Sequence, residues 1–300
     1  MRNRAWTRTA LGAAALALGA CAAGCASGGS AAPSAPSLEA APSPTAVSAP
    51  PTVARLAAVG DSITLGVNAC DEGGPCLDES WAVGTSDVDA FAARLADESG
   101  ARPTTLPFAL DGATAKDALD HVQEVIDQRP DVVTVLVGAN DACARTFDAM
   151  TPADRFASEI TALLQELTRG LPEATVLALS VPDLNQIWEI GKDDPDAVAL
   201  WDKSPSCRSL LWHADSTAAD DATRRAAVAE RVQQFNAAIA GACAALPTCV
   251  SDGGALHDVR FSADEVSSID HFHPSALGQA KIADVAWQVW QSRPVGEGAG

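Results

Sequence analysis

Basic residues are scarce in this sequence, which has 20 lysines and arginines against 39 aspartates and glutamates and a formal net charge of −19. The acidic residues are spread along the chain rather than gathered in one block. A protein that binds nucleic acid neutralises phosphates with a basic surface. The composition therefore argues against a nucleic-acid partner.

Long apolar runs are also lacking. Beyond the N-terminal segment no apolar run approaches the 18 residues that a membrane-spanning helix requires, so we expect no span in the body of the protein. At the N-terminus, Arg2, Arg4 and Arg8 precede the apolar stretch 10–20 (ALGAAALALGA), which is itself too short to cross a bilayer. Residues 1–20 are therefore predicted to be an export signal.

Residues 18–21, Leu-Gly-Ala-Cys, resemble a bacterial lipobox, in which the cysteine is lipidated and becomes the new N-terminus. Cys21 is the expected lipidation site, plain secretion is the alternative, and Cys25 is a poorer second candidate. Segment 21–51 is almost entirely Ala, Ser, Pro, Gly and Thr, so we predict a disordered tether. One domain over 52–293 and a tail at 294–300 follow, at the outer face of the membrane or in the cell envelope.

No Cys-x-x-Cys pair or Cys/His cluster has the spacing of a zinc site. Six cysteines follow Cys25, and an even count in an exported chain indicates disulfides. Two pairs would each close a short loop rich in Gly, Pro or Ala, which leaves a third pair; free buried thiols are the alternative. The predicted disulfides are Cys70–Cys76, Cys243–Cys249 and Cys143–Cys207.

Short apolar stretches alternate with segments of helical spacing after residue 52. Strands are predicted at 53–59, 104–110, 132–137, 174–179 and 249–250, and helices at 88–97, 115–127, 152–169, 223–245 and 274–290. This alternation is typical of a mostly parallel sheet buried on both faces. Active sites of such sheets lie at the carboxyl ends of the strands.

The alternation stops between residues 180 and 221, a stretch with several prolines and the tryptophans Trp188, Trp201 and Trp212. We interpret this segment as an excursion over the site, not as a domain. Its tryptophans are expected to form local core, with the lining of an acyl pocket as the alternative.

Residues with complementary chemistry follow the first three predicted strands. Ser62 offers a hydroxyl and a backbone N–H, Gly112 an unobstructed backbone N–H, and Asn140 a neutral side-chain amide. A serine becomes a nucleophile when a base removes its proton, and the oxyanion that forms needs donors. Asp61 and Asp141, beside them, are expected to serve the turns.

A base for this serine stands in the stretch 269–274 (IDHFHP). Asp270 and His273 are three residues apart, so one turn can bring the carboxylate against the imidazole. A metal site including His271 is the alternative, but Pro274 starts a helix there and no further ligands stand at suitable spacing. His271 is therefore expected to be a bystander, and no role is assigned to His121, His213 or His257.

Together these blocks resemble the SGNH (GDSL) hydrolase superfamily over residues 53–290: Gly-Asp-Ser at 60–62, a glycine block at 111–114, Gly-x-Asn-Asp at 138–141 and Asp-x-x-His-Pro at 270–274. The resemblance implies a flavodoxin-like three-layer α/β/α fold with about five strands, and ester hydrolysis without a metal or other cofactor. It implies Ser62 as nucleophile, His273 as base, Asp270 as its partner, and Ser62, Gly112 and Asn140 as the oxyanion hole. The second block reads DGAT, without the polar residue and nearby serine frequent in the family, so Gly112 has the least support.

The cysteines and the excursion are similar to those of exported actinobacterial members of the family. We therefore expect a monomeric serine esterase that acts through an acyl-enzyme, with lipid esters as first substrate candidates. O-acetyl groups on a cell-envelope glycan are the second candidate. An inactive binding module on the same fold is a third reading, against which the complete set of residues argues.

Overall fold

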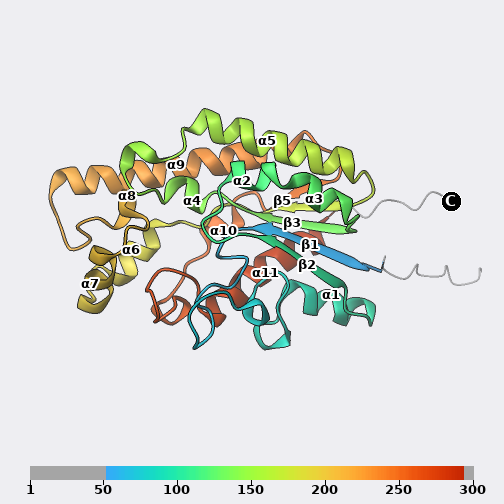
Figure 1. Cartoon of the computed structure of the whole chain (residues 1–300), viewed down its shortest axis with the longest axis horizontal. Helices are drawn as coiled ribbons and strands as arrows, with labels where there is room; N and C mark the ends of the chain where they lie inside the picture. The colour runs from blue at the N-terminus through green and yellow to red at the C-terminus, as the bar shows by residue number, and fades with distance from the viewer. Residues whose placement is uncertain (1–51, 294–300) are drawn as a thin grey trace, which may run out of the picture. The chain divides into compact units, whose positions relative to one another are not determined.

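The computed structural model describes residues 52–293 (Figure 1). The predicted signal, the tether with Cys21, and the tail 294–300 lie outside the described residues. Within 52–293, no helix combines the length and the apolar character needed to cross a bilayer. Five parallel strands form a sheet in the order β2-β1-β3-β4-β5. They are β1 (Arg55–Gly60), β2 (Thr104–Ala109), β3 (Val132–Leu136), β4 (Thr175–Ala178) and β5 (Cys249–Ser251).

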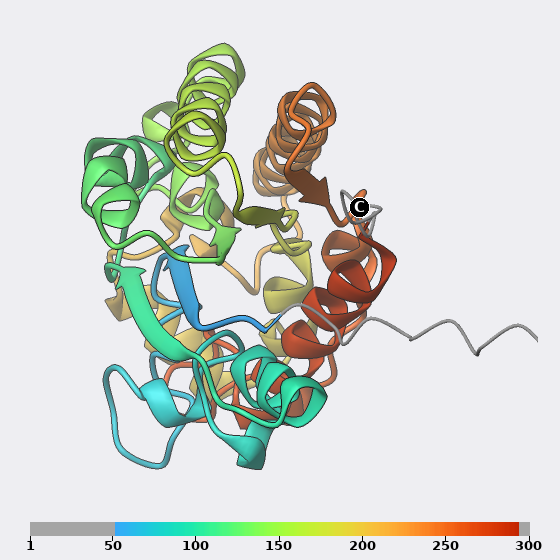
Figure 2. The same cartoon turned by 90° about the vertical axis from the view of Figure 1, so that its right-hand side faces the viewer.

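Helices cover both faces of the sheet (Figure 2). They are α1 (Phe91–Ser99), α2 (Ala115–Asp120), α3 (Val122–Asp127), α4 (Ala139–Ala142), α5 (Ala153–Gly170), α6 (Asn185–Gly191), α7 (Pro195–Lys203), α8 (Arg208–Leu211), α9 (Ala219–Ala244), α10 (Ala255–Asp258) and α11 (Ala276–Ser292). Helices α2, α3, α5 and α9 share one core cluster with the sheet, and α1 and α11 share the other. The predicted three-layer α/β/α class is thus confirmed.

Alternation along the strands assigns side chains to the two cores. In β1, Ala57 and Val59 belong to the cluster of α5 and α9, whereas Leu56 and Ala58 belong to that of α1 and α11. A strand covered on both faces needs apolar residues at every position, and all five residues of β3 are buried. Edge strand β2 is more exposed, which explains its weaker apolar pattern.

The helix predicted over 115–127 is in fact two helices, α2 and α3. His121 separates them with φ −100° and ψ 5°, outside the α-helical region. Its ring is exposed and Nδ1 lies 2.9 Å from Glu124 Oε1. Another correction concerns the last helix, which begins at Ala276 rather than Pro274, because the Ser275 side chain caps it by accepting from Gly278 N.

The three predicted disulfides, Cys70–Cys76, Cys143–Cys207 and Cys243–Cys249, are all present. The second joins the end of α4 to the start of α8 across 64 residues of sequence, with 4.1 Å between the Cα atoms. Ser209 reinforces this junction, because its Oγ donates to Ala142 O at 2.8 Å and accepts from Ala144 N at 3.1 Å. The excursion is therefore fixed to the loop that follows β3.

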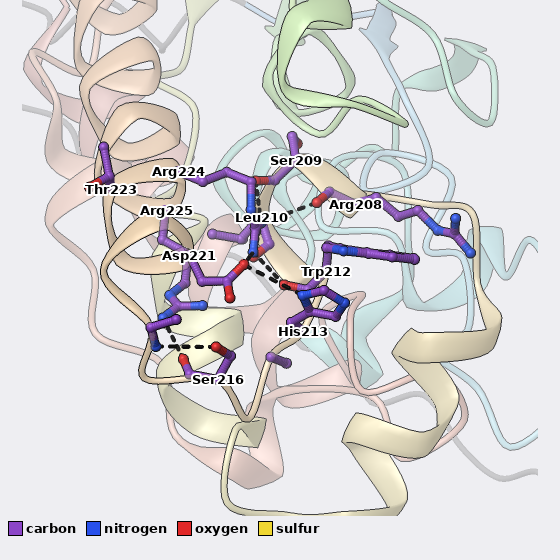
Figure 3. Close-up of polar contacts among 12 residues, drawn as sticks. Arg208, Ser209, Leu210, Trp212, His213, Ser216, Asp221, Thr223, Arg224 and Arg225 are labelled. Carbon is purple, nitrogen blue, oxygen red and sulfur yellow. Dashed lines mark hydrogen bonds and ion pairs between the residues drawn. The ribbon is translucent and has the colours of Figure 1, made fainter.

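Helix α9 also holds the excursion. Arg224 Nη1 donates to the carbonyl oxygens of Arg208, Ser209 and Leu210 at 3.2, 2.7 and 3.0 Å (Figure 3). These carbonyls belong to the short helix α8 and have few partners within it. Trp188 packs against the core, with the Arg225 guanidinium 4.3 Å from its ring centre, and Trp201 is buried. These two tryptophans are local core, as expected, whereas the expectation is wrong for Trp212, which is 37% exposed.

Candidate active site

The predicted site residues meet at the carboxyl edge of the sheet. In the register, Gly60 at the end of β1 pairs with Ala109 of β2 and with Leu136 of β3. The three strands therefore end side by side, and the loops with Ser62, Gly112 and Asn140 are adjacent.

A tight turn after β1 presents Ser62. Asp61 Oδ1 accepts from Ile63 N at 2.9 Å, and Val67 N donates to Ser62 O at 3.0 Å. Gly60 is required at the entry, since a Cβ there would lie 2.1 Å from Thr64 Oγ1. Ser62 is 5% exposed, so the turn holds the hydroxyl in a sheltered position.

Burial raises the pKa of the Asp61 carboxyl to about 7, although the Ile63 N–H and the charge of His273 act to lower it. Asp141 is likewise buried, and its Oδ2 accepts from Ala115 N at 2.9 Å at the start of α2. Asp61 thus serves its own turn, as the sequence predicts, whereas Asp141 joins its loop to the start of α2 rather than serving its own turn.

Hydrogen-bond donors converge beside the serine. Asn140 Nδ2 lies 3.0 Å from Ala113 O and 3.4 Å from Asp61 Oδ2. The second bond is long and therefore weak, so it would give way readily to a stronger acceptor. Gly112 has a φ of 78°, in the left-handed region that suits glycine. The N–H groups of Ser62 and Gly112 donate to no other described residue, which leaves them available.

The carboxylate and imidazole of IDHFHP contact one another as predicted. Asp270 Oδ2 lies 2.5 Å from His273 Nδ1, and Asp270 Oδ1 accepts from the backbone N–H groups of Phe272 and His273 at 2.9 and 3.0 Å. Burial opposes ionisation of Asp270, but the hydrogen bonds outweigh it and lower the pKa of this carboxyl. Asp270 therefore stays charged and fixes which ring nitrogen carries the proton.

His271 has a different environment from His273. Its φ is 52°, and its Nδ1 lies 3.8 Å from Oδ2 of Asp194, the N-cap residue of α7. The two rings thus have different partners and do not form a shared ligand set. Among residues 52–293, no group of three or more His, Cys, Asp or Glu side chains is placed to hold a metal ion.

Two cavities flank the site, and five residues line both of them: Ser62, Asn140, Cys143, Phe272 and His273. The first, termed the apolar cavity, has an empty volume of about 640 Å³ including its open mouth. Its other walls are mainly Leu184, Ile187, Ile190, Phe261 and Val266. The second, termed the polar cavity, has about 930 Å³, and its walls include Asp111, Gly112, Arg145, Trp201, Ser204 and Ser206.

The tryptophans of the excursion do not line the apolar cavity. Trp201 lies in the wall of the polar cavity instead, and the apolar wall comes from α6 and from the segment before α11. The alternative expectation, that a tryptophan of the excursion lines an acyl pocket, is therefore wrong for the apolar cavity, where the excursion contributes aliphatic side chains of α6 instead.

Sequence reasoning missed two side chains that support the site. Gln279 of α11 is fully buried, accepts from Trp81 N at 3.0 Å and donates to Ile63 O at 2.9 Å, which ties the serine turn to the helix. Its polar side chain on the buried face of an amphipathic helix is a signal that could have found it. Asn68 donates to Asp270 Oδ2 at 2.6 Å, and no sequence pattern marks it.

The fold is a three-layer α/β/α sandwich, and its carboxyl edge carries a serine after the first strand beside an aspartate–histidine pair, an arrangement found in hydrolases with a serine nucleophile. The sequence pattern of the GDSL-like Lipase/Acylhydrolase family matches residues 58–281, well over half of the 300-residue chain. The chain belongs to this family.

Solved structures share the fold at low identity. TesA is 17% identical, with a TM-score of 0.51 over 79% of this chain and 98% of that one. LAE5, an alpha/beta hydrolase enzyme from the metagenome of Lake Arreo, Spain, is 18% identical, with a TM-score of 0.50 over 81% and 97%. No match was found among curated proteins.

Proposed function

We propose that the protein hydrolyses carboxylic esters with Ser62 as nucleophile, His273 as general base and Asp270 as its partner. The observation that carries this proposal is that Ser62, His273 and Asn140 stand where the two cavities meet. An ester bound across this point has its carbonyl beside the serine, with one half in each cavity.

The steps follow from these positions. His273 takes the proton of Ser62 as the oxygen attacks the carbonyl carbon, and Asn140 Nδ2 with the N–H groups of Ser62 and Gly112 binds the oxyanion. The C–O bond to the alcohol then breaks, and the alcohol leaves with the proton from His273. Water, deprotonated by His273, releases the acid from Ser62.

The apolar cavity favours an acyl chain, because its aliphatic and aromatic walls gain from covering methylene groups. The polar cavity suits a hydroxylated alcohol. We therefore propose esters that join an acyl chain to a polar alcohol, with lipid esters first. The alternative is an O-acetylesterase acting on a cell-envelope glycan, for which the larger polar cavity would hold the sugar.

Export is part of the proposal. Three disulfides favour an oxidising compartment. The N-terminal pattern supports a signal and, at Cys21, a lipid anchor that would place the enzyme at the outer face of the membrane or in the cell envelope. We propose that it acts as a monomer.

A fluorophosphonate probe tests the chemistry. The wild type should be labelled at Ser62, found by peptide mass spectrometry, and Ser62→Ala should take up no probe. Ser268→Ala, a change at an exposed serine, is the matched control and should be labelled like the wild type. A folded wild type that stays unlabelled would show an inactive binding module instead.

Chain-length profiling with aryl esters separates the two substrate classes. Turnover that persists or rises from acetyl to long acyl chains supports lipid esters. Turnover confined to acetyl esters supports the glycan O-acetylesterase and rejects the lipid proposal.

A further inference from the structure

The Asp270 carboxylate is held by a side chain that lines neither cavity. Asn68 Nδ2 donates a 2.6 Å hydrogen bond to Asp270 Oδ2, the oxygen that also faces His273 Nδ1 at 2.5 Å. The other end of the amide fixes its orientation, because Asn68 Oδ1 accepts from Gly74 N at 2.8 Å. The amide nitrogen must therefore face the carboxylate.

The loop that carries Asn68 is closed in several ways. Asn68 N donates to Gly74 O at 2.8 Å, and Ser267 Oγ donates to Asn68 O at 2.6 Å. The φ of Asn68 is 58°, a left-handed conformation that asparagine adopts more readily than most residues. The disulfide Cys70–Cys76 closes the turn that follows. Each polar group of Asn68 thus has a partner, and the amide has little freedom to move.

We propose that Asn68 is a positioning residue for the Asp270–His273 pair, and that the disulfide loop 70–76 holds it in place. The inference rests on the proposed function, since it gives Asn68 a part in the reaction at Ser62. Asn68 is absent from the walls of both cavities, so it acts through Asp270 and not on the substrate.

A neutral amide suits this position. By fixing one carboxylate oxygen, it selects the orientation in which the Nδ1–H of His273 points at Asp270, which leaves Nε2 for the proton of Ser62. An amide takes up no proton and does not compete with the base. It also withdraws negative charge from Asp270, so its removal should make the imidazolium form of His273 more stable.

Other charged groups surround the pair. Asp61 acts on His273 from the turn after β1, Asp111 and Arg145 lie in the walls of the polar cavity, and Asp183 and Glu265 lie in the wall of the apolar cavity. These groups stay unchanged in the variants below, so a shift of the pH profile reports the contact of Asn68.

Glycine and aspartate can both adopt the left-handed backbone conformation of Asn68, so two substitutions can be made there without backbone strain. Asn68→Gly removes the amide, and Asn68→Asp keeps the size and the acceptor toward Gly74 N but places an oxygen against Asp270. For a short acetyl ester, kcat should fall about 10- to 100-fold in Asn68→Gly and further in Asn68→Asp, with KM within about twofold. The acid limb of the kcat/KM profile should move to higher pH in both, and further in Asn68→Asp.

A titration of the His273 ring by NMR, assigned with His273→Ala, measures the same shift without turnover. Asn185→Asp makes the same chemical change on α6, where the side chain donates to the exposed Glu189, and should behave like the wild type. Melting temperatures ensure that all rates are compared below unfolding.

These experiments distinguish a failure of the proposed function from a failure of the inference about Asn68. A wild type inert toward the fluorophosphonate refutes the proposed function. An active wild type whose Asn68→Gly variant matches it in kcat, pH profile and His273 titration refutes this inference alone. A lower kcat with an unshifted profile and titration would also overturn it, because Asn68 would then only stabilise the fold.

The proposal that the disulfide loop 70–76 holds Asn68 in place is tested separately. The variant Cys70→Ala/Cys76→Ala should change kcat and the acid limb in the direction of Asn68→Gly, but by less, because the hydrogen bonds of Asn68 remain. A variant with wild-type kcat and profile would show that the loop needs no disulfide to hold Asn68.

Discussion

The apolar and polar cavities share five wall residues, yet their remaining walls differ in origin and chemistry. Helix α6 and the segment before α11 give the first its aliphatic and aromatic surface, whereas the stretch 200–206 and the loop after β2 give the second hydroxyl and charged groups. The excursion contributes walls to both. Under the proposed function, the excursion would help to set which ester is accepted, while the sheet edge would supply the chemistry common to both sides.

The largest effect on activity is expected from substitutions in the wall that both cavities share, because these should remove the turnover of every ester alike. Ser62→Ala and His273→Ala remove the nucleophile and the base, and each should lower kcat about 10⁶-fold on every ester, whichever cavity its halves occupy. Initial rates with acetyl and long-chain aryl esters measure this. His271→Ala is the control, because its ring lies toward Asp194, and it should keep most activity. A comparable loss in His271→Ala would contradict the assignment of the base.

Loosening the excursion should affect the polar cavity, whose wall contains both Cys143 and Cys207. The variant Cys143→Ala/Cys207→Ala opens a 64-residue separation and should lose about 4 kcal/mol of unfolding free energy, measured by urea denaturation. Activity should fall at temperatures at which circular dichroism still shows a folded protein.

The matched control is Cys243→Ala/Cys249→Ala, which removes a disulfide of separation 6 away from both cavities. It should lose only about 2 kcal/mol and keep its activity while folded. If activity and ellipticity of the Cys143→Ala/Cys207→Ala variant disappear together, the bridge serves stability alone.

A buried carboxyl beside the shared wall makes stability depend on pH. The pKa of Asp61 is about 7 in the folded protein against an ordinary 3.8, so between these values the folded state holds a proton that the unfolded chain has released. Stability should therefore fall as the pH rises through this window, by about 2 to 3 kcal/mol between roughly pH 5 and 7. Urea denaturation of Asp61→Asn should lack this part of the decline; an identical pH dependence in both proteins would contradict it.

The smallest effect is expected when a larger side chain is placed in one cavity at a time. Such variants test which of the two cavities holds the acyl chain. Ile190→Trp narrows the apolar cavity and should lower kcat/KM about 10-fold for long-chain esters relative to acetyl esters, since several methylenes lose their contacts. Leu200→Trp makes the equivalent change in the polar cavity and should leave the chain-length ratio unchanged. Equal ratios in both variants would show that the acyl chain does not occupy the apolar cavity.

The strands were predictable because burial on both faces of the sheet requires runs of mainly apolar residues, such as 132–137. The helices were predictable from the helical spacing of their apolar residues. The strand ends then located Ser62 and Asn140, and a spacing of three located Asp270 and His273. The division of one helical segment into two helices depends on local backbone conformation, as at His121 between α2 and α3, and no pattern in the sequence predicted it. The walls of the cavities depend on how residues 180–221 fold back over the sheet, which no periodicity records.

Asn68 and Gln279 illustrate a second limit. Each supports the site through a bond to a residue about 200 positions away in the sequence, 202 for Asn68 and 216 for Gln279. Such bonds depend on tertiary packing. The only sequence signal for Gln279 is a polar residue on the buried face of a helix, and no pattern marks Asn68. The candidate catalytic residues could thus be predicted from local spacing, but the hydrogen bonds that hold them in place could not.

The direction of β1 and α11 has a practical consequence. β1 runs toward Ser62 from Arg55, whose N–H donates to Asp131 just before β3, and α11 runs away from Ser275 until Trp290 Nε1 donates to Glu98 at the end of α1. Both ends of the described chain therefore lie at the edge of the sheet opposite the serine (Figure 1). A surface or fusion partner joined through either end would leave the entrance facing outward, so the enzyme suits immobilisation by its termini.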